Sequence, residues 1–477
     1  MNPRWSSSEL SIALGVDPDG GADVAVSGVS IDTRTLQPGD LFVALKDVRD
    51  GHEFVSAAFK AGAGAALVGQ DYSRQASDGV LFRVSDPLAG LVALGRAARD
   101  RLSSDARVIG VTGSAGKTGT KEMLRAALSR LGVTHASEKS YNNHWGVPLT
   151  LARMPADTQF GVFEIGMNHA DEIRPLTKMV RPHAAIITTV EAVHLEHFPS
   201  VAEIADAKGE IFEGLLPGGS AIIKYDNPFA GRLKAIAEAC GAKPVTFGFD
   251  ANADVRGLDF RPSDDGCDMA VELAGETLSV HLAMPGRHIA ENALAVAAAL
   301  YSIGADVGGA MAALSDLAPP GGRGARSKLY VGGGEALLID ESYNANPASM
   351  KAALATLGAV PRQKYVRRIA VLGDMLELGS DAPVLHTDLK SAVDAADVDL
   401  VFACGPHMKG LYDALPATKK GGYSLTSPPL EAALASHLRA GDVVMIKASN
   451  GTRLGAVVAA LKTRFGTEQF EKDGPAA

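Results

Sequence analysis

The chain has 477 residues, 46% of them apolar and 21% charged, which is typical of a soluble globular protein and corresponds to about three domains. Its net charge of −9 argues against nucleic acid as a partner, because nucleic-acid-binding surfaces are basic. Its three scattered cysteines, without CxxC spacing, give no support to a disulfide framework or a zinc site and fit a reducing compartment.

We expect a cytoplasmic protein without stable membrane insertion. The N-terminal stretch MNPRWSSSEL lacks the apolar core of a signal peptide. Apolar runs such as AAIITTV at 184–190 are far shorter than the roughly 20 residues that a membrane-spanning helix needs. A monomer is the default expectation for the oligomeric state.

The first 85 residues predict a small N-terminal α/β domain. VAVSGVSIDTR alternates like a strand, and PGDLFVAL predicts a second strand after a Pro-Gly turn. SAAFKAGAGAALV predicts a helix that leads into a third strand. We therefore assign residues 1–85 to this domain.

A central domain, residues 86–318, is predicted next, beginning with a helix near 87–102. RVIGVTG at 107–113 is a buried-strand pattern that ends in a glycine-rich turn, and TKEMLRAALSRLG continues as an amphipathic helix. Further strands are predicted at 160–166, 184–190, 219–225 and 243–249. Their alternation with helical segments predicts a mainly parallel sheet with helices on both faces.

Proline and glycine cluster in LAPPGGRGAR at 317–326, which marks a second junction. Beyond it, strands are predicted at 336–340, 367–374, 399–404 and 442–449, with helical patterns between them. Residues 319–477 therefore predict a C-terminal, Rossmann-like α/β domain.

The segment 112–118 reads TGSAGKT and lies between a predicted strand and a predicted helix. Gly113 and Gly116 allow backbone N–H groups to approach phosphate oxygens, and the helix presents its positive end. Lys117 can reach the β- and γ-phosphates of a nucleotide, and the Thr118 hydroxyl can bind Mg²⁺. The match is to a shorter variant, TGxxGKT, because the first glycine of the general pattern is a valine here. A purely structural glycine turn with a surface lysine is the alternative, which the flanking strand and helix disfavour.

Three further side chains are candidates for the same site. Glu164 ends the strand pattern FGVFEIG, and strand ends face the ligand crevice of an α/β sheet, so it is either a magnesium ligand or a surface acid. His194 follows the strand pattern AAIITTV and is either a ligand or a structural histidine. Lys208, in ADAKGEIF, is either a solvated charge or a partly buried lysine open to chemical modification.

Six stretches together resemble the Mur ligase family, the ATP-dependent amino-acid ligases of peptidoglycan precursor synthesis. They are GVTGSAGKTGTKEML, FEIGMNHADEI, AVHLEHF, AKGEIFEGL, GRHIAENALAVAAAL and IDESYNANPASMKAAL, and they cover most of the chain in the family's order. The resemblance implies a UDP-binding N-terminal domain, a central ATPase domain and a C-terminal Rossmann-like domain.

Other stretches point to one branch of this family. SIDTRTLQPGDLFVAL, YNNHWGVPLTLA, SYNANPASM and GDMLELG resemble the members that add D-alanyl-D-alanine to UDP-N-acetylmuramoyl-tripeptide. The DNPR motif usual in the branch that adds the third amino acid is absent from the sequence. The implied substrates are therefore these two small molecules, and the sequence does not distinguish lysine from diaminopimelate in the tripeptide.

The resemblance also implies ATP, two Mg²⁺ ions and a carbamylated lysine. The implied ATP-binding residues are Gly113, Ser114, Ala115, Gly116, Lys117, Thr118, Asn292, Arg326 and Asp340. The implied metal ligands are Thr118, Glu164, His194 and Lys208 as its carbamate, and the implied catalytic residues are Lys117, Lys208 and His194. The implied substrate-binding residues are Ser30, Thr33, Arg34, Asn142, Asn143, Tyr343, Asn344 and Asn346. Among these, Asn292 matches the adenine contact, and Ser30, Thr33 and Arg34 match the uridine-diphosphate contacts.

The sequence departs from the family pattern in three places. Residues 190–193 read VEAV where asparagines are usual, Ile289 replaces an asparagine after GRH, and KASNGTR replaces a more basic phrase near the C-terminus. These departures concern adenine and substrate contacts and leave the phosphate and metal groups intact.

Four alternative functions stay open. A Mur-type ligase that adds a single amino acid, or a folylpolyglutamate synthase-like ligase, would use the same ATPase core. The domain that precedes the phosphate loop argues against the folate enzyme. A regulatory nucleotide-binding module would tolerate degenerate phosphate residues, which are intact here. A sugar-nucleotide-binding scaffold would not need the Lys117-Thr118 pair.

Overall fold

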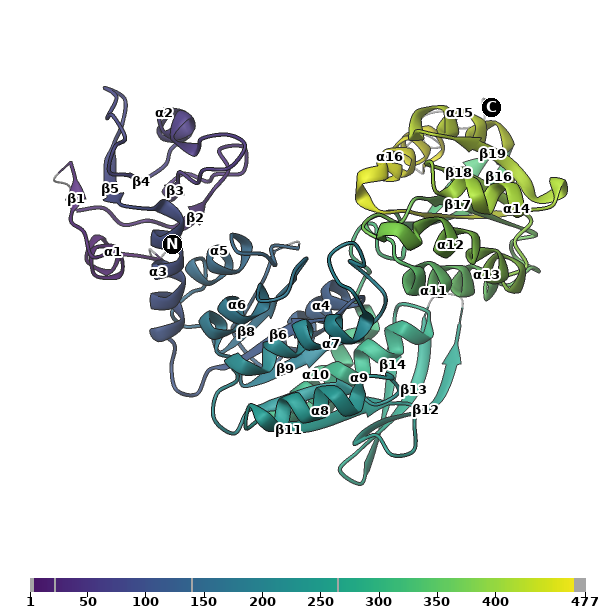
Figure 1. Cartoon of the computed structure of the whole chain (residues 1–477), viewed down its shortest axis with the longest axis horizontal. Coiled ribbons are helices and arrows are strands. Elements are labelled where there is room, and N and C mark those ends of the chain that lie inside the picture. Colours follow the sequence, from purple (N-terminus) through teal and green to yellow (C-terminus); the bar gives the residue numbers. More distant parts are fainter. Residues whose placement is uncertain (1–3, 21–22, 139, 264–265, 467–477) are drawn as a thin grey trace, which may run out of the picture.

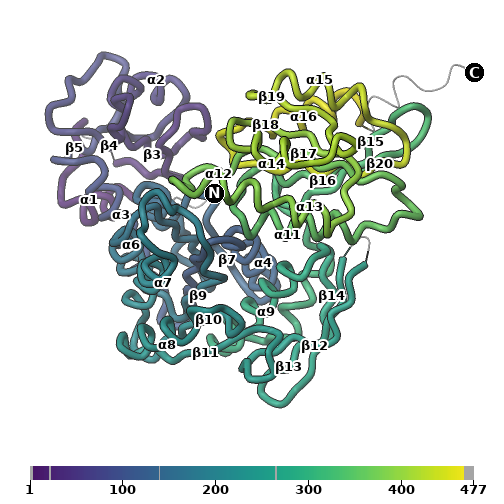
Figure 2. The backbone as a smooth tube through the Cα atoms, turned by 45° about the vertical axis from the view of Figure 1, so that its right-hand side comes forward, coloured from purple at the N-terminus to yellow at the C-terminus, as the bar shows by residue number. Residues whose placement is uncertain are grey.

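The computed structural model describes residues 4–20, 23–138, 140–263 and 266–466. Three α/β units, each built around its own sheet, follow one another along the chain. In Figure 1 the N-terminal unit stands at the upper left of the central unit and the C-terminal unit at the upper right, and in the turned view of Figure 2 both again lie above the central unit. The predicted α/β class with mostly parallel sheets is confirmed.

The N-terminal unit has a five-stranded sheet in the order β1-β5-β4-β3-β2, in which only β1 is antiparallel to its neighbour. Its strands are β1 (Pro18–Asp19), β2 (Gly28–Ser30), β3 (Asp40–Val43), β4 (Ala65–Gly69) and β5 (Val80–Val84). Its helices are α1 (Ser7–Leu14), η1 (Gly51–Phe54) and α2 (Val55–Lys60). The strand predicted from VAVSGVSIDTR is therefore confirmed in only its middle three residues.

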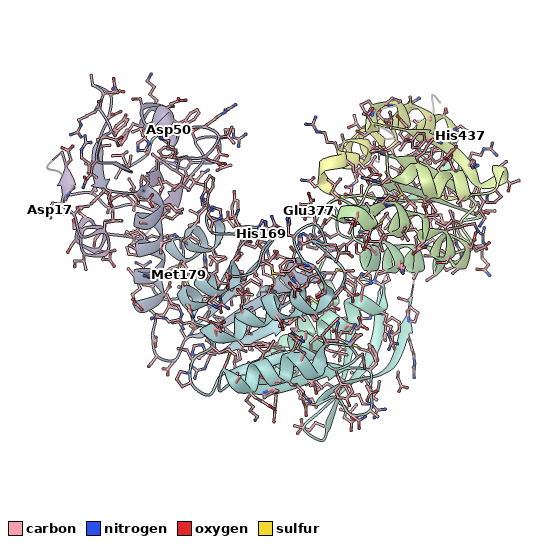
Figure 3. All side chains as sticks on the ribbon, viewed as in Figure 1. Asp17, Asp50, His169, Met179, Glu377 and His437 are labelled. Atoms are coloured by element: carbon pink, nitrogen blue, oxygen red, sulfur yellow. The ribbon has the colours of Figure 1, made fainter. Side chains whose placement is uncertain are left out.

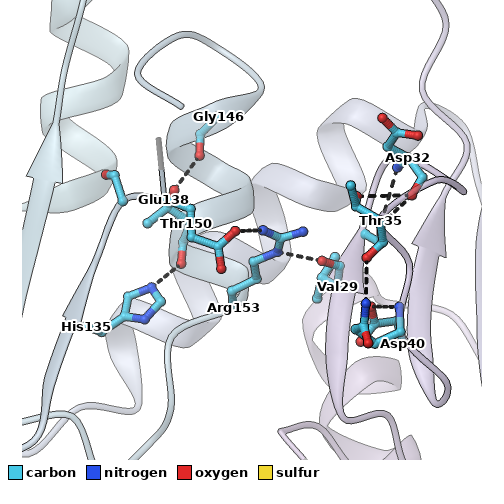
Figure 4. Close-up of polar contacts among 12 residues, drawn as sticks. Val29, Asp32, Thr35, Asp40, His135, Glu138, Gly146, Thr150 and Arg153 are labelled. Atoms are coloured by element: carbon cyan, nitrogen blue, oxygen red, sulfur yellow. Dashed lines mark hydrogen bonds and ion pairs between the residues drawn. The ribbon is translucent and has the colours of Figure 1, made fainter. Parts of the chain in front are cut away.

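Helix α3 (Pro87–Asp100) fastens the N-terminal unit to the central unit. Leu91, Leu94 and Ala98 of this helix belong to one hydrophobic cluster that continues from the first sheet into the central sheet. Arg153 adds polar contacts, because its Nε atom donates a hydrogen bond to Val29 O at 2.6 Å (Figure 4). This shared apolar core holds the two units as one packed body.

The central unit has a nine-stranded sheet in the order β14-β13-β12-β11-β10-β9-β6-β8-β7. Its strands are β6 (Arg107–Thr112), β7 (Thr134–Ala136), β8 (Phe160–Glu164), β9 (Ala184–Ile187), β10 (Ser220–Lys224), β11 (Lys243–Gly248), β12 (Val255–Pro262), β13 (Cys267–Leu273) and β14 (Glu276–Leu282). Its helices are α4 (Lys117–Ser129), α5 (Gly146–Ala152), α6 (Ile173–Val180), α7 (Val201–Gly209), η2 (Glu210–Gly214), α8 (Ala230–Ala239), α9 (Arg287–Ser302), α10 (Val307–Met311) and η3 (Ala312–Asp316).

Both faces of this sheet are buried, which explains why its strands are continuous apolar runs in the sequence. Along β9, Ala185 and Ile187 pack into the cluster on one face with α3, α5, α6, α7 and α8. Ala184 and Ile186 pack into the cluster on the other face with α4 and α9. The predicted parallel sheet with helices on both faces is thus confirmed from β7 to β12.

The hairpins β12–β13 and β13–β14 extend this sheet with antiparallel strands, which the strand patterns did not predict. In β13 the buried residues alternate with more exposed ones, so only one face of the extension is covered. That face belongs to the same hydrophobic cluster as α9.

The C-terminal unit has a six-stranded sheet in the order β15-β16-β20-β17-β18-β19, parallel except for the β15–β16 hairpin. Its strands are β15 (Ala325–Val331), β16 (Gly334–Glu341), β17 (Arg367–Gly373), β18 (Leu400–Cys404), β19 (Lys420–Ser424) and β20 (Asp442–Lys447). Its helices are α11 (Pro347–Gly358), η4 (Gly379–Asp381), α12 (Ala382–Thr387), α13 (Leu389–Ala395), α14 (Met408–Ala414), η5 (Ala417–Lys419), α15 (Ser427–His437), η6 (Asn450–Thr452) and α16 (Leu454–Phe465).

The C-terminal unit keeps its own core. Its two hydrophobic clusters cover the two faces of its sheet, and within the described ranges neither includes a residue of the central unit. Its contacts with the phosphate loop are polar instead, and they are described below. Nor does any helix that the structure describes combine the length and apolarity needed to cross a membrane.

Candidate active site

The phosphate loop joins the end of β6 to the start of α4. Gly113 and Gly116 have φ angles of +146° and +83°, a region that favours glycine. A Cβ atom at Gly116 would lie 2.6 Å from Asn292 Oδ1, so a side chain there would also clash. Gly116 caps α4 without a side-chain hydrogen bond, and the first turn carries no acidic residue. The first amide groups of α4 are thus available to an anion.

The side chain of Lys117 folds over this loop, and its Nζ atom donates a hydrogen bond to Gly113 O at 2.6 Å. Burial lowers the pKa of Lys117, while the nearby Glu164 carboxylate opposes the shift and the Arg323 guanidinium adds to it. A bound anion would favour the charged form of the amine. This lysine is therefore placed to bind phosphate.

A buried carboxylate lies beside the loop. The pairing of β8 with β6 sets Glu164 opposite Val111, at the carboxyl edge of the sheet. Glu164 is 1% exposed, and its two oxygens accept hydrogen bonds of 2.8 Å from Thr118 Oγ1 and from Asn142 Nδ2. Since neither donor neutralises the charge, this arrangement suits a divalent cation with oxygen ligands.

Lys208 lies on the buried side of α7 and is 2% exposed. No hydrogen bond of its ammonium group is found among the residues that the structure describes. Burial lowers the pKa of Lys208 well below its usual value, and the positive charge of Lys117 lowers it further. Burial and the neighbouring Lys117 therefore both favour the uncharged, nucleophilic form of this amine.

His194 connects the central unit to the C-terminal unit. Its Nδ1 atom lies 2.6 Å from Oε2 of Glu377, which belongs to the loop after β17. This hydrogen bond is the main reason that the pKa of Glu377 lies below its usual value. The sequence did not single out Glu377.

Asn346 links the C-terminal unit to the phosphate loop. It is the N-cap of α11, where its Oδ1 atom accepts a hydrogen bond from Ser349 N at 2.8 Å. Its Nδ2 atom donates to Ser114 O at 3.4 Å. One buried side chain therefore both starts a helix and contacts the loop.

Asp340 organises a second loop of the C-terminal unit. Its carboxylate accepts hydrogen bonds from Gly322 N at 3.2 Å and from the Ser342 hydroxyl at 2.6 Å. These bonds hold the segment in which the Arg323 guanidinium stacks on the Tyr343 ring, 4.3 Å from its centroid. Asp340 thus fixes the positions of Arg323 and Tyr343 through hydrogen bonds to the residues beside them.

Two cavities, of about 300 and 320 Å³, open on either side of the phosphate loop. The first, here named the Asn292 cavity, is lined by residues that include Asn292, Met123, Lys224, His288 and Lys447. The second, here named the Glu164 cavity, is lined by residues that include Lys117, Thr118, Asn142, Glu164, His194 and Tyr343. Ser114, Ala115, Gly116, Arg323, Asn344 and Asn346 line both. The loop therefore separates one chamber that ends at α9 from another that ends at the buried carboxylate.

Some predicted residues lie outside these two cavities. Arg326, on β15, lines a third cavity of about 1020 Å³ instead. Asn143 lies beside Asn142, but its Oδ1 atom accepts hydrogen bonds from Trp145 N and Gly146 N at the start of α5. Arg326 and Asn143 are thus near the site without lining either cavity.

The predicted uridine-diphosphate contacts lie in the N-terminal unit. Ser30 is buried, and its hydroxyl donates to Asp32 O at 3.1 Å. Arg34 forms an ion pair of 2.6 Å with Asp32, and its side chain is 86% exposed. Thr33 lies between them and is partly exposed. These residues form one local cluster, apart from the phosphate loop.

Arg323 and Lys447 line the Asn292 cavity although the sequence did not single them out. Lys447 is 2% exposed, donates to Asn344 O at 2.8 Å and lies 3.5 Å from Glu341. Its burial lowers its pKa. The signal for Lys447 was its place as the last residue of the strand β20, because the carboxyl ends of parallel strands face the ligand crevice.

Comparison with known proteins identifies the family. The family model of the Mur ligase middle domain matches residues 111–300, and that of the Mur ligase glutamate ligase domain matches residues 326–450. The UDP-N-acetylmuramoyl-tripeptide–D-alanyl-D-alanine ligase of Escherichia coli is 38% identical over 81% of this chain and 82% of its own length. The corresponding Rickettsia prowazekii ligase is 30% identical over 95% of this chain and 99% of its own length.

The fold of this chain also matches that of solved MurF structures. The crystal structure of MurF from Acinetobacter baumannii superposes with a TM-score of 0.84 at 28% identity, covering 97% of this chain and 99% of that one. MurF ligase from Thermotoga maritima in complex with ADP superposes with a TM-score of 0.76 at 24% identity, covering 92% and 98%, a likeness of fold alone. With a shared fold, two matching domains and relatives that span nearly the whole chain, this protein belongs to the Mur ligase family.

Proposed function

We propose that this protein is an ATP-dependent ligase that joins D-alanyl-D-alanine to UDP-N-acetylmuramoyl-tripeptide in peptidoglycan precursor synthesis. One observation carries the proposal: the phosphate loop separates two cavities, and the second contains a buried carboxylate, Glu164, whose two hydrogen-bond donors are neutral. A ligase that activates a carboxylate with ATP needs such a division, because the nucleotide and the acceptor must meet at the γ-phosphate. The names and coverage of the relatives support the choice of substrates.

ATP would occupy the Asn292 cavity with its phosphates across the loop. Asn292, on α9, lines that cavity close to Gly116 and would contact the base. The loop residues 113–118 and Lys117 would bind the phosphates. Asp340 would shape the loop over the nucleotide, and Arg326, which lines the third cavity, is retained as a proposed nucleotide contact.

The residues beside the loop fit two Mg²⁺ ions. Thr118 and Glu164 offer a hydroxyl and a carboxylate to the first. His194 and Lys208 would hold the second, and the burial of Lys208, which lowers the pKa of its amine, supports carbamylation. Carbamylation would convert it into an anion with two oxygens. When bound, the ions neutralise charge on the transferred phosphoryl group.

The reaction would proceed in two displacements. A carboxylate oxygen of the tripeptide forms a bond to the γ-phosphorus while the bond to the β-phosphate oxygen breaks, which gives an acyl phosphate and ADP. The dipeptide amine then forms a bond to the carbonyl carbon, loses a proton and expels inorganic phosphate. Lys117 and the loop amides would stabilise the phosphoryl charge in both steps. The C-terminal unit would exclude water from the acyl phosphate.

The N-terminal unit would hold the UDP end of the acceptor through Ser30, Thr33 and Arg34. Because this unit shares its apolar core with the central unit, the span from the UDP contacts to the Glu164 cavity would be constant during closure. Asn142, Asn143, Tyr343, Asn344 and Asn346 would contact the acceptor or the incoming dipeptide. We propose the domain limits 1–85, 86–318 and 319–477, supported by the three sheets that lie within them.

A phosphate-release assay over a panel of substrates tests the proposal. UDP-muramoyl peptides of different lengths would be crossed with D-dipeptides, single amino acids, folates and glutamate. We expect release only with the tripeptide, D-alanyl-D-alanine, ATP and Mg²⁺ together. Release with a single amino acid would identify another Mur-type ligase, and release with folate and glutamate would identify the folate enzyme. A single chain supplies both cavities, so we also expect a monomer, which light scattering checks. We further propose a cytoplasmic location, which cell fractionation checks.

A further inference from the structure

The contact between His194 and Glu377 joins two units across 183 residues of sequence, at 2.6 Å between Nδ1 and Oε2. Glu377 lies at the side of the C-terminal unit that faces the central unit (Figure 3). Both residues line the Glu164 cavity, together with Thr118 and Glu164. A residue of the C-terminal unit therefore contacts a proposed magnesium ligand of the central unit directly.

The chemistry of the pair defines the tautomer of the histidine. An ionised carboxylate only accepts hydrogen bonds, so Nδ1 of His194 must carry the proton in this contact. In the neutral ring the lone pair then resides on Nε2. A histidine that binds a metal through one nitrogen generally donates its other N–H to a carboxylate or a carbonyl, which also sets the ring orientation. In this pair, Glu377 is the carboxylate that accepts from Nδ1 of His194, which leaves Nε2 of His194 for a metal ion.

The loop that carries Glu377 is tied to the phosphate-loop contact. Leu376 N donates to Ser449 Oγ at 3.0 Å, and Ser449 Oγ donates to Ala345 O at 3.3 Å. The next residue, Asn346, donates to Ser114 O in the phosphate loop. A continuous path of bonds therefore connects the two points at which the C-terminal unit touches the site.

The local backbone supports a specific role for this contact. His194 and Glu377 both have positive φ angles, +55° and +62°, which are unfavourable for residues other than glycine. Gly379, two residues on, has a φ of +57°, and a Cβ atom there would lie 3.3 Å from Glu196 Cα. The two loops are thus closely fitted against each other, and such strained positions concentrate at functional sites.

We propose that Glu377 is a positioning residue that the C-terminal unit delivers to His194, where it fixes the tautomer and ring orientation needed to bind the second Mg²⁺. Closure of the C-terminal unit would then complete the metal site and the phosphate contact in one movement. This inference rests on the proposed ligase function, because that function supplies the need for a second metal ion.

The test measures Mn²⁺ binding to the full-length protein by electron paramagnetic resonance, with a non-hydrolysable ATP analogue present. The wild type should bind two ions per chain. Glu377→Ala should weaken one of the two sites about 10- to 100-fold, the range usual for such partners, and Glu377→Gln, which retains an acceptor, should weaken it less. His194→Ala should affect the same site, and adding Glu377→Ala to it should cause no further loss.

Glu196→Gln is the matched control, because it removes an exposed carboxylate two residues from His194. It should leave both Mn²⁺ sites unchanged, and thermal melting should show that all variants are folded. Unchanged Mn²⁺ binding in Glu377→Ala would overturn the inference while the ligase function stands. The same conclusion would follow if Glu377→Ala raised only the KM for the dipeptide, since Glu377 would then bind the amine. A wild type that bound no Mn²⁺ with the nucleotide would instead refute the proposed function.

Discussion

The side-chain amide of Asn346 donates a hydrogen bond to the backbone carbonyl of Ser114, 232 positions earlier in the chain. Ser114 belongs to the phosphate loop of the central unit, and Asn346 is the N-cap residue of α11 in the C-terminal unit. The contact is polar, and no shared apolar core joins the two units within the described residues. The C-terminal unit can therefore engage the loop and release it at a small cost in free energy.

Substitution of Asn346 should slow ligation by weakening closure. Asn346→Ser retains the helix cap but is too short to reach Ser114, so kcat/KM should fall about two- to tenfold, the value of one net hydrogen bond. Asn346→Ala should show the same kinetic loss and, in addition, lose about 1 kcal/mol of stability with the cap. Steady-state kinetics and chemical denaturation separate the two effects. Wild-type kinetics in Asn346→Ser would show that the contact has no role in turnover.

Lys117→Ala should abolish turnover and leave the fold intact. Its amine is the only lysine amine seen to bond to the phosphate loop in the described part of the chain, and removal of one such donor typically costs at least about 100-fold in rate. Phosphate release and circular dichroism check the two halves of this prediction. Lys60→Ala, at the exposed end of α2, is the control and should keep full activity. Wild-type rates in Lys117→Ala would remove the basis for the phosphate-loop assignment.

Lys208→Ala should be nearly inactive, and a small added carboxylate should partly restore its activity. The added acid would fill the space of the carbamate and supply its two oxygens. Lys121 provides a contrast, because it is equally buried but forms an ion pair of 2.6 Å with Glu122 and donates to Ser137 O. Lys121→Ala should lower stability, and no carboxylate should rescue it. Normal activity of Lys208→Ala without an additive would contradict the carbamate.

Stability should fall as the pH decreases from about 6.5 toward 4, partly because of His135. Burial lowers the pKa of His135 to about 4, whereas the unfolded chain binds that proton near 6.5. The stabilisation is therefore complete above about pH 6.5 and is lost as the pH falls through this window. The neutral ring donates from Nε2 to Thr150 O at 2.7 Å (Figure 4).

Urea denaturation at pH 7.5, 6 and 5 measures this effect. Between pH 7.5 and 5, His135→Gln should flatten the pH dependence by about 2 kcal/mol, since pH 5 lies about 1.5 units below the unfolded-state pKa and one pKa unit is worth about 1.4 kcal/mol. His144→Gln, which replaces an exposed histidine of the same region, should leave the slope unchanged. Equal slopes in wild type and His135→Gln would show that another group controls the acid sensitivity.

The phosphate loop was predictable because its chemistry is local. A strand, two glycines at positive φ, and a Lys-Thr pair at a helix start are all encoded within a dozen residues, and the structure places them as expected. Glu164 followed from its position at a strand end, since parallel strands present their carboxyl ends at one edge. The branch of the family also followed from short quoted stretches, which the relatives then supported.

Tertiary structure alone decided which distant residues meet. Periodicity cannot pair His194 with Glu377 or Asn346 with Ser114, because these contacts depend on how two separately folded units pack. It cannot show that Arg323, and not Arg326, lines the cavities beside the loop, because Arg323 lies in the turn before β15 and Arg326 lies in the strand itself. Local sequence sets the conformation of each segment through backbone sterics and burial, whereas contacts between units depend on the relative position of whole cores, which no short pattern encodes.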